Sequence, residues 1–190
     1  DGASPVGRIA GVDDLAAWPG TIEQYDAKPG FFDIDAGDVI AYSFQGGGGY
    51  GDPLDRAQEA VVADVRDGYV SVEMAAAAYG VVIDGDVVDE ARTEARKNAI
   101  RRERAGDEIT ATDAAPVPDD VRWLTPDVYI RGGAVYTRAG AELGTTHDWV
   151  SGTVRRIVDP ASHGPYIRLH EELELREYAC PRSGSLLWSA

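Results

Sequence analysis

The feature that decides the fold of this chain is the stretch Gln45-Gly46-Gly47-Gly48-Gly49-Tyr50-Gly51-Asp52-Pro53-Leu54-Asp55-Arg56. Glycine has no Cβ, so such a run can take positive φ angles and approach another chain closely. The preceding residues 38–44 alternate like a strand, and residues 55–66 have the apolar spacing of a helix. A glycine loop between a strand and a helix is a setting in which backbone N–H groups can bind an anion.

The glycine-rich run partly resembles two phosphate-binding motifs, the dinucleotide-binding fingerprint and the P-loop. Gly46, Gly48 and Gly51 satisfy G-x-G-x-x-G, but a glycine tract does so by accident, and Asp52 and Pro53 separate it from the helix. A P-loop would need Lys and then Ser or Thr after its last glycine. We therefore favour a structural turn or a contact with a substrate or another subunit. The residues predicted for this contact loop are Gly46, Gly47, Gly48, Gly49, Tyr50, Gly51 and Asp52.

The order and spacing of three segments resemble a known family. Residues 46–56, 60–71 and 79–82 closely resemble the C-terminal end of the hydantoinase B / oxoprolinase large subunit, over roughly residues 30 to 104. The resemblance implies partner subunits of the hydantoinase A type and B type. Together, these subunits make ATP-dependent amidohydrolases and ATP-dependent ketone carboxylases. Most of the catalytic body of the B-type subunit would lie N-terminal to the residues that match here.

Length, composition and charge agree with a part of a larger assembly. The chain has 190 residues, 44% of them hydrophobic, which suits one compact domain or two small ones. No apolar run approaches the length of a membrane span, and the single cysteine suits a reducing cytoplasm. A net charge of -15 argues against nucleic-acid binding. We expect a cytoplasmic protein that contacts neither nucleic acid nor membrane.

The expected fold class is α+β, in three regions. Residues 1–105 form the hydantoinase B C-terminal-like segment, with a β hairpin around Ala36-Gly37, the glycine-rich loop and helices. Within it, Ser71 and Asp89 are predicted helix N-caps, Gly68 and Gly80 end helices, and Asp84-Gly85 is a hairpin turn. Residues 106–120 have linker composition. Residues 121–190 form a small all-β module, with strands predicted at 128–130, 135–137, 154–158 and 173–178.

The C-terminal module carries a second resemblance. Residues 175–187 are similar to the end of the gamma subunit of acetone and acetophenone carboxylases, where a Cys-Pro-x-Cys-Gly knuckle and an upstream knuckle bind zinc. Here only Cys180 stands at a ligand position, because Ser183 replaces the second cysteine and the upstream counterpart has Thr137 and Ala139. Structural zinc needs four ligands. We therefore expect a zinc-ribbon-like module without metal, in which Cys180 is a buried thiol. Its expected small core comprises Trp149, Tyr166, Tyr178 and Trp188.

Other candidate sites are weaker. His147, His163 and His170 could be recruited as metal ligands or bases but lack ligand spacing, and lone histidines are more often surface residues. Asp33, Asp35 and Asp38 could cluster on one strand face, although acidic residues beside a turn usually serve solvation. The third predicted helix carries a run of arginines. We favour a solvated face for this run, and the alternative is a surface that binds an acidic partner: Arg92, Arg96, Arg101, Arg102 and Arg104. No residue is assigned a catalytic role.

The combined resemblances predict a small subunit of an ATP-dependent hetero-oligomeric ketone carboxylase, mainly structural within the complex. They imply ATP and Mg or Mn on partner subunits and no cofactor on this chain. One alternative is a part of an ATP-dependent cyclic amide hydrolase of the hydantoinase/oxoprolinase type. Others are a purely structural scaffold and a free-standing nucleotide-binding module. The isolated chain is predicted to be inactive.

Overall fold

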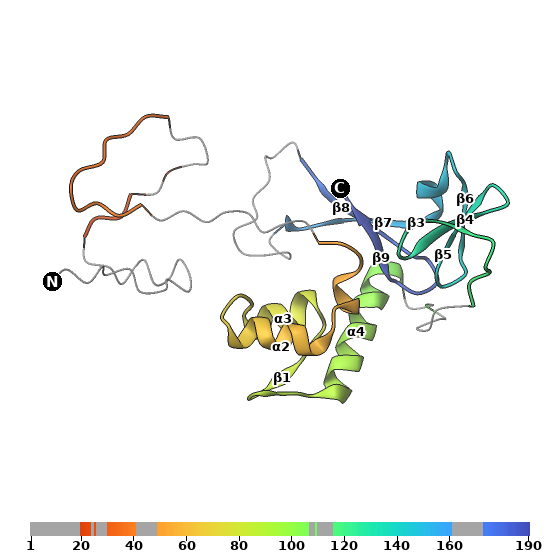
Figure 1. The fold of residues 1–190 in the computed structure, drawn as a ribbon, viewed down its shortest axis with the longest axis horizontal. Helices are drawn as coiled ribbons and strands as arrows, with labels where there is room; N and C mark the ends of the chain where they lie inside the picture. Colours follow the sequence, from red (N-terminus) through yellow and green to blue (C-terminus); the bar gives the residue numbers. More distant parts are fainter. Residues whose placement is uncertain are drawn as a thin grey trace. The chain divides into compact units, whose positions relative to one another are not determined.

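The computed structural model describes residues 20–23, 25, 30–40, 49–106, 109, 116–160 and 173–190 (Figure 1). The chain divides into two compact units, Asp1–Gly48 and Gly49–Ala190. The described part of the second unit is mixed α+β, with three α-helices followed by small antiparallel sheets.

In the first unit, the structure contains the expected turn without its strands. The Asp38 amide donates to the Asp35 carbonyl at 3.1 Å, and Ala36 and Gly37 form the turn. Residues 30–40, however, contain no strand, and Phe31, Ile34 and Ile40 are exposed. The predicted strands are therefore wrong over residues 30–40, and an isolated two-stranded hairpin is at best marginally stable in water. The predicted strand residues 41–44 lie outside the described part.

Two helices of the second unit, and its hairpin turn, begin where the sequence predicts. The helix α3 (Val72–Ala78) begins after Ser71, whose hydroxyl accepts from the Met74 amide at 3.1 Å. Helix α4 (Glu90–Ala105) begins after Asp89, whose carboxylate accepts from the Arg92 amide at 2.9 Å. A two-stranded hairpin, β1 (Ile83–Asp84) and β2 (Val87–Val88), turns at Gly85 as expected. These three predictions are confirmed because each depends on residues that are close in sequence.

The first helix differs from its prediction. Residues Pro53–Asp55 form a 3-10 turn, η1, and helix α2 (Gln58–Arg66) begins three residues later than expected. The turn starts at Asp52, whose side chain accepts from the Leu54 amide, and proline at the first helical position needs no N–H partner. In Figure 1, α2 and α3 lie side by side next to α4. Their core comprises Val61, Ala75 and Val81, with partly buried Val65, Val70, Tyr79, Ile83 and Val88 packed against it.

The remainder of the second unit is made of two antiparallel sheets. The first has the order β3-β4-β5-β6, with β3 (Arg122–Thr125), β4 (Val128–Arg131), β5 (Ala134–Thr137) and β6 (Glu142–Thr145). The second has the order β7-β8-β9, with β7 (Val154–Val158), β8 (Leu175–Ala179) and β9 (Leu186–Ser189). A second 3-10 turn, η2 (Trp149–Gly152), lies between the sheets in sequence and packs on β6. The all-β character expected for residues 121–190 holds over the described residues.

The core of the first sheet consists of Val128, Val135 and Leu143, with Ile130, Trp149 and Leu187 against it. Of the aromatic residues expected in the core, Tyr178 is buried, whereas Trp188 stacks on it at 4.9 Å and stays 46% exposed. Tyr166 lies outside the described part. The predicted boundaries at residues 105 and 120 stay a prediction. Among the described helices, none is long and apolar enough to span a membrane.

Candidate functional site

The end of the glycine-rich run is held by a buried carboxylate. Asp52 Oδ1 accepts from the Leu54 amide at 3.0 Å and from Arg104 Nη1 at 2.9 Å. Its Oδ2 accepts from the same Arg104 nitrogen at 2.9 Å and from the Leu186 amide at 2.8 Å. The Asp52 side chain has no exposed surface. These contacts, which we call the Asp52 cluster, join the start of η1 to the end of α4 and the start of β9.

Arg104 belongs to the arginine run that the sequence predicts to be a solvated face. Its side chain is 5% exposed, and its Nε has no hydrogen-bond partner among the described residues, so its buried charge depends on Asp52. Arg101 lies 3.5 Å from Asp55, and Arg96 donates to the Ala76 carbonyl. The solvated-face interpretation is wrong for these three arginines. Their partners lie 20 to 52 residues away in sequence, where helix periodicity gives no signal.

The structure describes four of the seven predicted contact-loop residues, and only the last of these faces the interior. Gly46, Gly47 and Gly48 lie outside the described residues. Gly51 has φ +83°, Tyr50 is 84% exposed, and Gly49 is exposed as well. Asp52 faces the interior, so its role in the structure is to fix the run rather than to reach outward. Contact with a substrate or another subunit stays a prediction for this loop.

A polar cavity of about 300 Å³ lies beside the Asp52 cluster. The residues that line it come from η1, α4, the end of β5, β9 and three hairpin turns: Asp55, Arg101, Asp127, Thr137, Arg138, Ala139, Cys180, Ser183, Ser185 and Leu187. Gly184 allows the β8–β9 turn to approach α4 here. It has φ +71°, and a Cβ on it would lie 2.3 Å from the Arg101 carbonyl oxygen.

Two carboxyl groups in this cavity have pKa values above the ordinary value of an aspartate. The Asp55 side chain is half-buried, and this partial burial raises its pKa above the ordinary value of 3.8; the Asp52 carboxylate raises it further, against the opposing effect of Arg101. Burial also raises the pKa of Asp127, followed by the Asp55 carboxylate, while Arg138 lowers it. Each carboxyl therefore holds its proton to a higher pH than an exposed aspartate does. Sequence reasoning missed Asp127, because neither its burial nor its proximity to Asp55 is visible locally.

The same cavity brings together the four predicted knuckle positions. Thr137, Ala139, Cys180 and Ser183 all line it, and the Cys180 thiol lies 3.4 Å from the Thr137 hydroxyl. The two turns have related backbone hydrogen bonds, with Thr137 N–H to Ala141 O and Cys180 N–H to Ser185 O. Cys180 is 1% exposed, so the prediction of a buried thiol is confirmed. The described residues contain no group of three or more metal-ligating side chains.

The remaining candidates do not form a site in the described part of the chain. His147 is exposed, and His163 and His170 lie outside it. Asp33, Asp35 and Asp38 are exposed, and the Asp38 carboxylate accepts from the Asp35 amide at 2.8 Å within the turn. Asp35 and Asp38 therefore shape a local turn, and all three carboxylates lie at the surface, in line with the interpretation that they serve solvation.

Comparison with known proteins finds that part of this chain is similar to subunits of multi-subunit enzymes. It is 58% identical over 55 residues to the beta subunit of the caprolactamase of Pseudomonas jessenii, covering 28% of this chain and 10% of the relative. It is 40% identical over 81 residues to the alpha subunit of the acetone carboxylase of Xanthobacter autotrophicus, covering 40% of this chain and 10% of the relative. It is 47% identical over 53 residues to the B subunit of a putative D-/L-hydantoinase from a Pseudomonas species, covering 27% and 9%.

Part of the chain is homologous to subunits of the hydantoinase B/oxoprolinase group. The chain spans about a tenth of the length of these relatives. No family model matches the chain, and no solved structure matches it. The resemblance of residues 175–187 to a carboxylase gamma subunit stays a prediction.

Proposed function

We propose that this chain works as a small, mainly structural part of an ATP-dependent, hetero-oligomeric ketone carboxylase. The observation that carries the proposal is the match to the alpha subunit of acetone carboxylase, which covers more of this chain than the other two matches do. The similarity of residues 175–187 to a carboxylase gamma subunit supports the same branch. The large partners are A-type and B-type subunits, which bind ATP and Mg or Mn and hold the reacting groups.

A second candidate is a part of an ATP-dependent cyclic amide hydrolase. The match to the beta subunit of caprolactamase has the highest identity of the three, and a hydantoinase component is also related. In both candidates this chain has the same task. Its buried Asp52 cluster fixes the end of the glycine-rich run on α4 and β9, so that the residues directly before Asp52, Tyr50 and Gly51, are presented to a partner.

We further propose that the β region is a zinc-ribbon-like module that has lost its metal. The two knuckle turns line one cavity, as they would around an ion, but they offer a single thiol. The Cys180–Thr137 contact and the packing of Leu187 on Val128, Val135 and Leu143 join the sheets instead.

The test is reconstitution with A-type and B-type large subunits from the organism that encodes this chain. We expect the complete complex to consume a ketone and bicarbonate with ATP hydrolysis, and the isolated chain to be inactive. Omission of this chain should lower turnover or assembly. ATP-dependent opening of a lactam or hydantoin, without ketone consumption, would favour the hydrolase. An active isolated chain would contradict both.

A further inference from the structure

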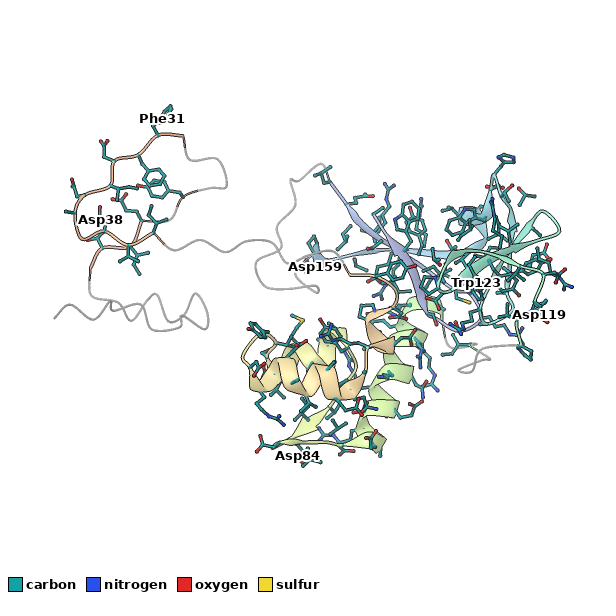
Figure 2. All side chains as sticks on the ribbon, in the orientation of Figure 1. Phe31, Asp38, Asp84, Asp119, Trp123 and Asp159 are labelled. Atoms are coloured by element: carbon teal, nitrogen blue, oxygen red, sulfur yellow. The ribbon has the colours of Figure 1, made fainter. Side chains whose placement is uncertain are left out.

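We propose that an aromatic groove beside the glycine-rich run binds an extended segment of the B-type partner, one that presents an apolar side chain next to a carboxylate. The groove has a volume of about 440 Å³ and is lined by Tyr50, Trp123, Leu124, Thr125, Pro126 and Arg138. This inference rests on the proposed function, because it assumes that the partner is a large subunit. Trp123 is labelled in Figure 2.

The residues of this groove are the types that dominate protein interfaces. Trp123 and Leu124 are 45% and 43% exposed, and Tyr50 is 84% exposed. Tryptophan, tyrosine and arginine supply most interface hot spots, because a large flat side chain removes much water for little loss of rotamer entropy. Contiguous exposed apolar side chains mark interaction sites more often than isolated ones do. Here they come from two segments more than 70 residues apart in sequence, the glycine-rich run and β3.

Well-packed contacts lie directly next to both walls of the groove. On one side, Tyr50 lies two residues before Asp52, whose carboxylate is fixed by Arg104 and the Leu186 amide. On the other side, the Trp123 ring packs edge-on against Tyr129 at 5.4 Å, and Tyr129 stacks on Tyr136. Walls that are already in place reduce the entropy lost on binding.

The backbone of β3 favours recognition through side chains over addition of a strand. β3 is an edge strand of its sheet, but its pairing with β4 shifts between Trp123 and Thr125, which leaves Leu124 as the extra residue of a bulge. A bulge interrupts the row of free backbone groups that an added strand would need. The occupant is therefore held in the groove by its side chains.

The charge of Arg138 sets the chemistry of the occupant. Its guanidinium lies 5.8 Å from the centre of the Trp123 ring, and in the described residues no carboxylate forms an ion pair or hydrogen bond with it. Asp127 attracts it without pairing with it. A carboxylate on the partner, next to an apolar side chain that enters between Tyr50 and Trp123, would complement this site.

The experiment measures the affinity of this chain for a B-type large subunit from the same organism, by calorimetry at two salt concentrations. We expect Trp123→Ala to weaken binding about tenfold or more, with Trp188→Ala as the matched control. Trp188 has nearly the same exposure, 46% against 45%, but lies on the other sheet. Arg138→Glu should weaken binding and remove part of its salt dependence, whereas Arg155→Gln, an exposed arginine on β7, should not.

Each outcome decides between alternatives. If the wild-type chain binds while Trp123→Ala and Arg138→Glu bind equally well, the groove is not the interface and the proposed function stands. If the wild-type chain binds no large subunit, the proposed function fails, and this occupant fails with it. Self-association of the wild-type chain in sedimentation, abolished by Trp123→Ala, would show that a second copy occupies the groove. Circular dichroism and melting temperature verify that each variant folds.

Discussion

The carboxylate of Asp52 connects the end of the glycine-rich run to helix α4 and strand β9 through hydrogen bonds. A carboxylate with no exposed surface loses its hydration, and only charged or hydrogen-bonding neighbours can offset that loss. Arg104 supplies the charge, and the Leu54 and Leu186 amides complete the contacts. Because the pair is buried on both sides, removing either partner is more costly than removing both.

We predict that Asp52→Asn destabilises the folded chain by about 3–5 kcal/mol, because it leaves the Arg104 guanidinium buried without a counter-charge. The matched control is Asp55→Asn, three residues along, whose side chain is 54% exposed and only loosely paired at 3.5 Å. That change should cost less than about 1 kcal/mol. Urea unfolding of the two variants makes the comparison. An equal loss in both would mean that the Asp52 cluster contributes no more than a surface ion pair.

At the scale of the elements, sequence patterns predict what is local and miss what is distant. Ser71, Asp89 and Gly85 are recognisable as caps and a turn because their partners lie within a few residues. Asp55, the last residue of the 3-10 turn, is predicted as the first residue of the helix, since the Asp52 contacts that shape the turn come from Arg104 and Leu186. The strands expected at residues 32–40 do not form there, because alternation alone supplies no surface for them to cover.

The same limit applies to the candidate site. The knuckle positions Thr137, Ala139, Cys180 and Ser183 are predicted through a resemblance, and the structure brings them to one cavity. Asp55, Asp127 and Arg101 line that cavity too, but nothing in their local sequence indicates it. Tyr50 is predicted as part of the contact loop, whereas its neighbours Trp123 and Arg138 are not. Residues that meet only through tertiary packing leave no period or spacing to read.

The approach of the β8–β9 turn to α4 gives a prediction at this scale. Gly184→Ala and Gly133→Ala both place a side chain at a positive φ, +71° and +85°, which costs about 1–2 kcal/mol. At Gly133 the new Cβ meets nothing within 4 Å, whereas at Gly184 it overlaps the Arg101 carbonyl. We expect Gly184→Ala to lose about 1–3 kcal/mol more, because α4 and the turn must separate. Equal melting temperatures for the two variants would contradict this close contact.

At the scale of the whole molecule, the two sheets meet through their turns. The β5–β6 turn carries Thr137, the β8–β9 turn carries Cys180, and the two side chains are in contact at 3.4 Å. Leu187 from β9 also packs on the core of the first sheet. A zinc-bound ribbon would join such turns by four metal–ligand bonds. In this chain, apolar packing and one thiol–hydroxyl contact hold the same positions.

This arrangement predicts that the metal site can be restored. The triple variant Thr137→Cys, Ala139→Cys, Ser183→Cys, together with native Cys180, should bind a single zinc ion, because four thiolates at the two turns match the tetrahedral preference of zinc. Since zinc would bind the folded chain, the melting temperature of the variant should rise with zinc concentration. The wild-type chain should contain no zinc.

Elemental analysis and the absorption spectrum of the cobalt-substituted protein measure this site. Adding Cys180→Ser to the triple variant is the control, and it should weaken the metal site because only three thiolates remain. Zinc that binds equally with and without Cys180 would place the ion elsewhere. A triple variant that folds but takes up no zinc would show that the turns do not converge tetrahedrally, and the interpretation of the β region as a ribbon without its metal would then be wrong.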